Sequence, residues 1–345
     1  MSESLQLSCV SVVDKTPLVK VFRFRVVGTV ADWCAFKAGR YVSLGFPDIE
    51  GLLQHRCYSI VRIVAPNMFE VAIQKSGRHQ VADALFHRLS IGDLVSCKPP
   101  AGSITVDRLA SCKQILMLAG GIGVTLPMAL IEELSALHKL RGSGPVVRLV
   151  LCSPRREETP FLQELLTLQA SAQWFSLDLC LTREPQKNDG GSFHAGRPTT
   201  ALFDSLPLPD AVVICGSQDF ARSMQQRVEM YPASEVMIEA FSSPVARALG
   251  AEETSSATNC LQVEGLSEVI ALRPGTSLLE HLLEADIALA HECRAGICGS
   301  CRIKLLRGGC TSEMDFALGV HERKAGYVLA CCTFPAGESM TVALP

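Results

Sequence analysis

Residues 291–301 read HECRAGICGSC and place three cysteines, Cys293, Cys298 and Cys301, within eleven residues. Zinc sites usually show two C-x2–4-C pairs, or one pair followed by spaced histidines. Here the spacing is C-x4-C-x2-C, which is the ligand spacing of a plant-type [2Fe–2S] cluster. The glycines of the loop allow the positive φ angles that a tight wrap around inorganic sulfur needs. The stretch therefore predicts a [2Fe–2S] site, with a zinc knuckle or free thiols as the alternatives.

The fourth ligand must come from a distant part of the chain, and Cys310, Cys331 and Cys332 are the downstream candidates. The segment GYVLACCTFP (326–335) resembles the closing motif of ferredoxins, in which the cysteine follows Leu-Thr or Leu-Ala, and this resemblance implies Cys331. Cys310 and Cys332 are then expected to be structural thiols. His291 invites a Rieske interpretation, but Rieske centres replace two cysteines by two histidines, so a surface role is expected for it.

Composition sets the broad class. The chain has 345 residues, 48% of them hydrophobic, which is enough for two or three domains with their own cores. The formal net charge of −3 offers no basic face for nucleic acid, and no apolar run reaches the roughly 18 residues of a membrane helix. The N-terminus lacks a secretion signal, so the 15 cysteines indicate a reducing compartment, and a cytoplasmic location is expected.

The first third of the chain has short alternating runs separated by Gly, Pro and Asp. Such runs predict an antiparallel β-barrel or sandwich, interrupted by one helix at 81–89. The expected strands are 19–27, 41–46, 57–64, 69–74 and 94–99.

The pattern of apolar residues changes near residue 112, where continuous apolar runs typical of buried strands begin to alternate with helical segments. This pattern predicts an α/β domain with a parallel sheet. The expected strands are 114–119, 148–153, 175–182, 211–217 and 235–241, and the expected helices are 127–140, 161–170 and 220–230. A polar, small-residue stretch at 243–259 is interpreted as a linker. The last segment, 260–345, holds a strand pair, a helix at 277–286 and the cysteine loop.

Two glycine turns in the α/β region indicate a nucleotide site. AGGIGVT (119–125) follows an apolar strand and precedes a helix, which is the context in which a backbone turn approaches a pyrophosphate. CGSQDF (215–220) is a second turn of this kind after the strand AVVI. In the barrel, Arg56, Tyr58 and Ser59 form an R-x-Y-S pattern whose groups suit a flavin's ring and phosphates. By itself, that pattern is more often plain barrel surface.

The order of these three parts resembles the ferredoxin–NADP reductase superfamily, and within it the oxygenase-reductase group with a C-terminal plant-type ferredoxin. AGRYVSLGF, HRCYSI and CKPPAGSITV resemble the barrel of phenylacetyl-CoA epoxidase reductase subunits. The resemblance covers nearly the whole chain. It implies a flavin-binding β-barrel over 1–108, an NAD(P)H-binding α/β domain over 109–242, the linker, and a β-grasp ferredoxin domain over 260–345.

The resemblance also implies roles for single residues. Arg56, Tyr58 and Ser59 would hold the flavin, FAD with FMN as the alternative, and Cys215 and Glu239 would orient and seat the nicotinamide for catalysis. The remaining cofactor-binding positions that it implies are Ala72, Ile73, Gln74, Val81, Ala82, Asp83, Gly120, Gly121, Gly123, Thr125, Gly216 and Phe241.

The chain departs from the family at three points. The pyrophosphate loop has Ala82 or Asp83 where a Ser or Thr is usual, and an Asp beside two phosphates is unfavourable unless it points away. GGIGVTLP displaces the family's proline by one position to Pro127, and SQDF replaces P-x-x-M after the CG turn.

The choice of nucleotide depends on LTREP (181–185). Thr182 and Arg183 match the pair that holds the 2′-phosphate of NADPH, with Arg155 assisting, because a guanidinium suits a phosphate in geometry and charge. Glu184 keeps NADH open, and NADPH is favoured.

The resemblance implies an electron-transfer reductase that passes electrons from NAD(P)H through flavin and cluster to an oxygenase component bound near the 293–301 loop. Two alternatives are a reductase for a non-oxygenase acceptor, and a redox sensor or binding module in which only the cluster works.

Overall fold

The computed structural model describes residues 4–28, 36–47, 51, 53–75, 77, 81–184, 192–229, 231, 235–241, 259–291, 294, 296, 298–312, 315 and 317–345. The chain divides into two compact units, Met1–Glu239 and Ala240–Pro345. No helix in this described part of the chain is both long and apolar enough to cross a membrane.

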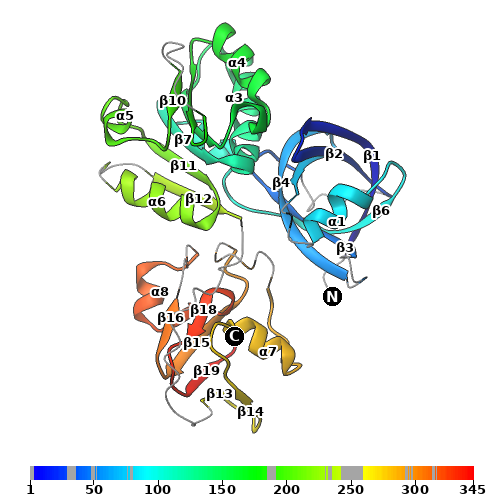
Figure 1. Ribbon diagram of the computed structural model, residues 1–345, viewed down its shortest axis with the longest axis vertical. Coiled ribbons are helices and arrows are strands. Elements are labelled where there is room, and N and C mark those ends of the chain that lie inside the picture. The colour runs from blue at the N-terminus through cyan, green and yellow to red at the C-terminus, as the bar shows by residue number, and fades with distance from the viewer. Residues whose placement is uncertain are drawn as a thin grey trace. The chain divides into compact units, whose positions relative to one another are not determined.

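Six antiparallel strands of the first unit close into a barrel in the order β1-β2-β5-β4-β3-β6 (Figure 1). Their alternating residues fill its interior, where Phe22, Phe24 and Phe69 are fully buried. Helix α1 (Val81–Arg88) packs on this core through Val81 and Leu85. The strands are β1 (Leu5–Thr16), β2 (Val19–Val26), β3 (Tyr41–Pro47), β4 (Leu53–Ala65), β5 (Met68–Gln74) and β6 (Leu94–Ala101).

A parallel sheet follows in the same unit, in the order β10-β9-β8-β7-β11-β12. The short helix α2 (Val106–Leu109) leads into it. Its strands are β7 (Gln114–Gly120), β8 (Val146–Ser153), β9 (Phe175–Leu181), β10 (Phe193–Ala195), β11 (Ala211–Gly216) and β12 (Glu235–Ala240). Its helical segments are η1 (Gly121–Val124), α3 (Thr125–Arg141), η2 (Arg156–Glu158), α4 (Leu162–Ser171), α5 (Thr200–Asp204) and α6 (Gln218–Val228).

The strand order reverses direction at β7. From β7 the chain moves outward through β8 and β9, and then returns to place β11 on the other side of β7. In open α/β sheets, ligands bind outside the carboxyl ends of the strands at such a switch point. We therefore expect a ligand to bind at the turns that follow β7 and β11.

The second unit is a β-grasp fold with a five-stranded mixed sheet in the order β14-β13-β19-β15-β17 and a small β16-β18 sheet. Ser277 caps helix α7 (Leu278–Glu284) in a reciprocal capping box with Glu280. The strands are β13 (Cys260–Val263), β14 (Val269–Ala271), β15 (Arg302–Arg307), β16 (Cys310–Ser312), β17 (Tyr327–Leu329), β18 (Thr333–Pro335) and β19 (Met340–Ala343), with α8 (Val320–Lys324) and η3 (Ala330–Cys332) between them.

The predicted fold class is confirmed: a β-barrel, a parallel-sheet α/β part and a β-grasp ferredoxin domain. The N-terminal strand β1 was not among the expected strands, and neither was the three-residue β10. The predicted linker, 243–259, lies outside the described residues except for Asn259.

Candidate functional site

The two glycine turns lie side by side at the switch point of the sheet. A Cβ on Gly123 would lie 2.3 Å from the Cys215 carbonyl oxygen and 2.7 Å from the Gly216 Cα, so only glycine allows this close approach. Gly121 adopts φ +55°, in the left-handed region that favours glycine, and nothing crowds it. Thr125 is buried in the first turn of α3, directly after this turn. The structure thus brings the two predicted nucleotide turns together.

Phe220 lies against both turns, and the sequence interpretation missed it. A Cβ on Gly120 would meet the ring at 2.9 Å, and one on Gly216 would meet it at 2.7 Å. Phe220 is held there by the start of α6, where its N–H donates to the Ser217 hydroxyl at 3.3 Å. The available signal was the departure SQDF, in which an aromatic ring takes the place of the family's methionine.

Three predicted residues from three different strands meet in a buried cluster. Ser59 of β4 donates its hydroxyl to Oε1 of Glu239 on β12 at 2.6 Å. The Cys215 thiol at the end of β11 donates to the same oxygen at 3.9 Å. One strand of the barrel and two strands of the parallel sheet therefore share one carboxyl group.

The electrostatics of this cluster follow from burial. Burial raises the pKa of Glu239 from 4.5 to about 7, although the hydrogen bonds from Ser59 and Cys215 act in the opposite direction. Burial, and then the nearby Glu239 carboxylate, raises the pKa of the Cys215 thiol well above its ordinary value. Cys215 is therefore a neutral thiol, suited to packing and weak donation rather than to nucleophilic attack. Phe241, two residues after Glu239, directly follows β12 and is partly buried.

The R-x-Y-S strand fits a flavin on one direct observation. The Tyr58 hydroxyl is buried and has no hydrogen-bond partner among the described residues, although buried polar groups are nearly always paired. Burial raises the pKa of Tyr58 well above its ordinary value, so it is a neutral donor. A cofactor with polar atoms would supply the missing partner. Arg56 donates from one guanidinium nitrogen to the His55 carbonyl at 2.8 Å.

The other positions expected around the flavin have mixed surroundings. Ile73 and Val81 belong to the barrel core, so only their backbone could contact a cofactor. Asp83 is buried and accepts the N–H of Gly77 at 3.0 Å, so its carboxylate holds the loop before α1. This contact gives the aspartate a structural role in place of the Ser or Thr expected there. Ala82 packs partly buried against the core, Ala72 is buried, and Gln74 is partly exposed at the end of β5.

The residues expected to choose the nucleotide lie together at the carboxyl ends of β8 and β9. The N–H of Thr182 donates to Ser153 O, and that of Arg183 donates to Pro154 O, both at 2.9 Å. Arg155 faces Glu157 and Glu158 at 3.7 and 3.8 Å. The Glu184 carboxylate accepts the backbone N–H of Arg156 and so joins the same group. Cations and carboxylates are therefore interleaved here.

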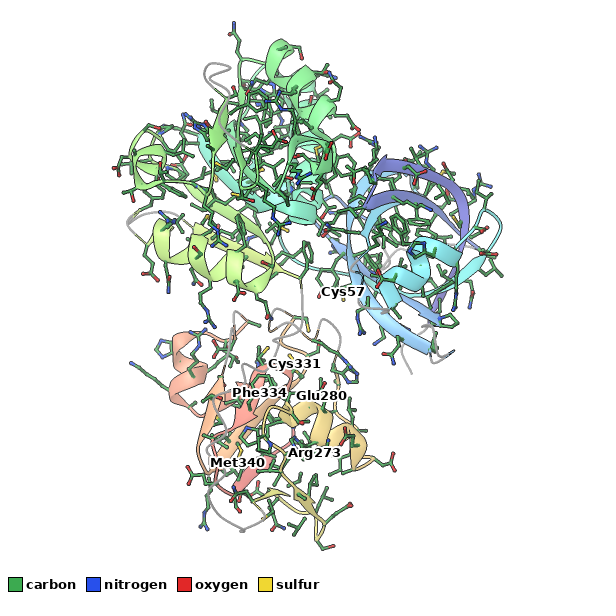
Figure 2. The ribbon with its side chains drawn as sticks, viewed as in Figure 1. Cys57, Arg273, Glu280, Cys331, Phe334 and Met340 are labelled. Carbon is green, nitrogen blue, oxygen red and sulfur yellow. The ribbon has the colours of Figure 1, made fainter. Side chains whose placement is uncertain are left out.

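The cysteine loop supplies donors that suit an iron–sulfur cluster. Cys301 and Cys331 are buried, and their thiols lie within hydrogen-bonding distance of each other. This thiol pairing, together with burial, raises the pKa of Cys301 well above its ordinary value. The backbone N–H of Gly296 points at the sulfur of Cys331, the residue labelled in Figure 2.

The backbone of the loop bends tightly, as the glycines predicted. Arg294, Gly296 and Gly299 all have positive φ angles, of 52°, 74° and 73°. Cys298, which lies between Gly296 and Gly299 in the sequence, is partly buried. Within the described residues, no three metal-ligating side chains converge on one point. The fourth predicted ligand, Cys293, lies outside the described residues.

The competing candidates in this domain have structural contacts. The Cys332 sulfur lies 3.3 Å from that of Cys331 and is fully buried, whereas Cys310 lies in β16. His291 bonds the Leu289 carbonyl through Nδ1 and Arg294 through Nε2, so both ring nitrogens are engaged within the loop. The prediction that Cys331 is the ligand is consistent with these contacts.

Comparisons with known proteins support this picture. Residues 261–336 match the family of 2Fe-2S iron-sulfur cluster binding domains. The chain is 24% identical over 356 residues to the glycine betaine monooxygenase reductase subunit of Chromohalobacter salexigens, covering 95% of this chain and 92% of that protein. It is 23% identical over 352 residues to a subunit of the 1,2-phenylacetyl-CoA epoxidase of Escherichia coli, covering 97% of this chain and 96% of that protein.

The fold has a solved counterpart over its full length. The solved structure of phthalate dioxygenase reductase, described as a modular structure for electron transfer from pyridine nucleotides to [2Fe–2S], matches with a TM-score of 0.65 and 20% identity. That match covers 99% of this chain and 98% of the other. Residues 261–336 therefore form a 2Fe-2S iron-sulfur cluster binding domain, and over nearly its whole length the chain is similar to reductase components of oxygenases, with the glycine turns, the buried Ser59–Glu239 contact and the cysteine loop in the corresponding parts of the fold.

Proposed function

We propose that this protein takes electrons from NAD(P)H and delivers them one at a time to a terminal oxygenase component, in the cytoplasm. The observation that carries the proposal is the Glu239 carboxyl group, which Ser59 of the barrel and Cys215 of the sheet both contact. A reductase of this kind must hold two cofactors from two domains in contact, and this cluster joins those domains at the switch point of the sheet. The buried free thiols Cys9 and Cys97 fit a reducing compartment.

Each group of residues has a distinct task in this proposal. Tyr58 and Arg56 hold the flavin, assigned as FAD, and the Gly121–Gly123 turn receives the dinucleotide phosphates at the start of the helical segment that follows. Glu239 orients Ser59 by accepting its hydrogen bond, and buried Cys215 limits how far the nicotinamide can enter. A flavin held by these residues would supply the chemistry that turns a two-electron hydride donor into single-electron steps toward the cluster. Cys293, Cys298, Cys301 and Cys331 hold that cluster near the surface that meets the oxygenase.

The nucleotide is assigned as NADPH on Thr182 and Arg183. A guanidinium at this position binds a 2′-phosphate by charge and by its forked geometry. Parallel titrations with NADPH and NADH test the assignment. A lower half-saturating concentration for NADH in the wild type would reverse it.

A turnover assay separates this proposal from its alternatives. The purified protein should reduce cytochrome c continuously with NAD(P)H, whereas a sensor with degenerate flavin and nucleotide sites would give no turnover. Cys215→Ala should slow flavin reduction in stopped-flow measurements and leave the cluster spectrum unchanged. An unchanged rate would remove Cys215 from the site. Addition of candidate oxygenase components, compared with other acceptor proteins, would then identify the partner class.

A further inference from the structure

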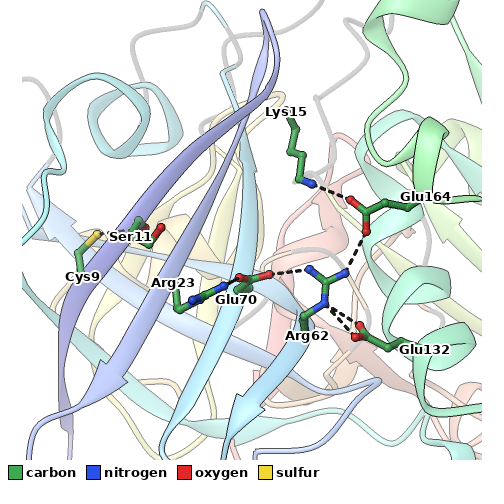
Figure 3. Close-up of polar contacts among 8 residues, drawn as sticks. All are labelled: Cys9, Ser11, Lys15, Arg23, Arg62, Glu70, Glu132 and Glu164. Carbon is green, nitrogen blue, oxygen red and sulfur yellow. Dashed lines mark hydrogen bonds and ion pairs between the residues drawn. The ribbon is translucent and has the colours of Figure 1, made fainter. Parts of the chain in front are cut away.

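A row of alternating charges crosses the outer face of the barrel. Glu70 of β5 lies opposite Arg23 of β2 and opposite Arg62 of β4 in the strand register. Its carboxylate bonds Arg23 at 2.7 Å through one oxygen and Arg62 at 3.0 Å through the other (Figure 3). The Glu70 side chain is only 7% exposed, so both ion pairs are well shielded from water at their acidic partner.

Arg62 continues this row into the nucleotide-binding part of the same unit. Its Nε lies 2.9 Å from both carboxylate oxygens of Glu132 on α3, and one terminal nitrogen lies 3.0 Å from Glu164 on α4. Lys15, at the end of β1, bonds the other oxygen of Glu164 at 2.6 Å. One guanidinium therefore holds three carboxylates from one strand and two helices, and Figure 3 shows it between the barrel strands and the helices.

The network is balanced and depends on a guanidinium. Three cations, Lys15, Arg23 and Arg62, face three carboxylates. The planar guanidinium presents donors in several fixed directions, whereas a lysine offers one compact charge. A register shift in β4 between Ile60 and Arg62 aims the side chain. An isolated surface pair is worth little, but this one is a network around a shielded carboxylate.

The network also shares its elements with the site. Ser59, which contacts Glu239, lies three residues before Arg62 on β4. Glu132 lies on α3, the helix that begins immediately after the Gly121–Val124 turn. Arg62 and Glu132 therefore join β4, which carries the R-x-Y-S motif, to α3, which follows the nucleotide turn. This ion pair is a second connection between the two elements, outside the site.

We propose that Arg62 is a positioning residue that sets the distance and angle between flavin and nicotinamide by fastening β4 to α3 and α4. The proposal rests on the proposed hydride transfer from NAD(P)H to a flavin. Hydride transfer requires the reacting atoms at near-contact distance, and a displacement of about 1 Å can cost about a hundredfold in rate. Loss of the fastening should slow that transfer, and cofactor content should remain normal.

The test compares Arg62→Met and the double variant Glu132→Gln/Glu164→Gln with wild type, all as holoproteins. The double variant removes both ion pairs from Arg62 to the helices, together with the Lys15–Glu164 pair, and leaves the Arg62–Glu70 pair in place. Arg25→Met is the matched control, because Arg25 is an exposed arginine of β2 with no ion pair among the described residues. Stopped-flow at saturating nucleotide measures the limiting rate of flavin reduction, and a titration measures nucleotide affinity.

Both test variants should reduce flavin about tenfold to a hundredfold more slowly, with nucleotide affinity within about twofold of wild type. The long-wavelength charge-transfer absorbance between nucleotide and flavin should weaken in parallel. Arg62→Lys should recover part of the rate. Calorimetry should show the barrel and the parallel sheet unfolding together in wild type and in Arg25→Met, but separately in the two test variants.

Wild-type rates in both test variants, or a slow Arg62→Met beside a normal double variant, would overturn the proposal. The proposal would also be overturned if the barrel and the parallel sheet unfolded in one calorimetric transition in every variant. Failure of the proposed function is a different result, in which the wild-type protein itself does not reduce its flavin. In that case calorimetry alone still decides whether Arg62 fastens the two parts.

Discussion

The buried carboxyl group of Glu239 should make the stability of the first unit depend on pH in a direction opposite to that of most carboxylates. Its pKa in the folded protein is raised from 4.5 to about 7 by burial. A group with a raised folded pKa contributes stability that is fully present below the unfolded pKa and is lost as pH rises through the folded pKa. The loss should therefore run from about pH 4.5 to about pH 7.

The size of the loss follows from the same pKa values. A pKa raised from 4.5 to about 7 in a fully buried group corresponds to about 3 kcal/mol of unfolding free energy. The matched variant is Glu239→Gln, which keeps an oxygen that can accept the Ser59 hydroxyl but has no proton to lose. Urea unfolding followed by circular dichroism at pH 4.5 to 8.5 would compare the two proteins.

The stability of the variant relative to wild type should rise by about 3 kcal/mol across this range. All other titrating groups cancel in that comparison. A difference between the two proteins that stays constant with pH would refute the account, because Glu239 would then ionise alike in the folded and unfolded states.

Four further substitutions test other parts of the structure. Gly123→Ala should lower nucleotide affinity at least about tenfold and cost about 1–3 kcal/mol of unfolding free energy, because its Cβ would overlap the Cys215 carbonyl. Titration calorimetry measures the affinity, and thermal unfolding measures the stability. A variant that binds the nucleotide with normal affinity would contradict the close approach of the two turns. Cys331→Ser should abolish the visible absorbance of the cluster and Cys332→Ser should retain it; the reverse result would exchange the ligand assignment. Burial lowers the pKa of His281, whose two ring nitrogens are both hydrogen-bonded, so the second unit should lose stability as pH falls below about 6.5. In thermal melts followed by cluster absorbance, His281→Gln should depend less on pH than wild type does. Melting temperatures that fall equally with pH in both proteins would contradict this prediction.

Local patterns predicted the elements that carry a strong periodic signal. The alternating runs that became β2 and β5, and the apolar run that became β7, were read directly from the sequence. The strand β1 was missed because its polar interruptions weaken the alternation, and it is held as a strand by pairing with β2 and β6. Pairing between strands that are distant in the sequence is a tertiary effect. It cannot be predicted from the alternation of apolar and polar residues within one short segment.

The site was predictable as residue types but not as contacts. The motifs pointed to Ser59, Cys215 and Glu239 one by one, yet a separation of 180 residues between Ser59 and Glu239 hides their hydrogen bond. The sequence indicated that the Asp83 carboxylate would be unfavourable beside a phosphate. Only the structure shows that this carboxylate accepts a hydrogen bond from the N–H of Gly77. The role of Arg62 left no local signal, because its partners lie on one other strand and two helices.

The most direct test of the central claim is an anaerobic stopped-flow reaction of the holoprotein with NAD(P)H, recorded at flavin and cluster wavelengths together. We expect flavin absorbance to bleach first and cluster absorbance to follow in the same molecules, and we expect Cys331→Ser to keep the first phase and lose the second. A cluster that stays oxidised while the flavin is fully reduced, or a flavin that the nucleotide does not reduce, would contradict it.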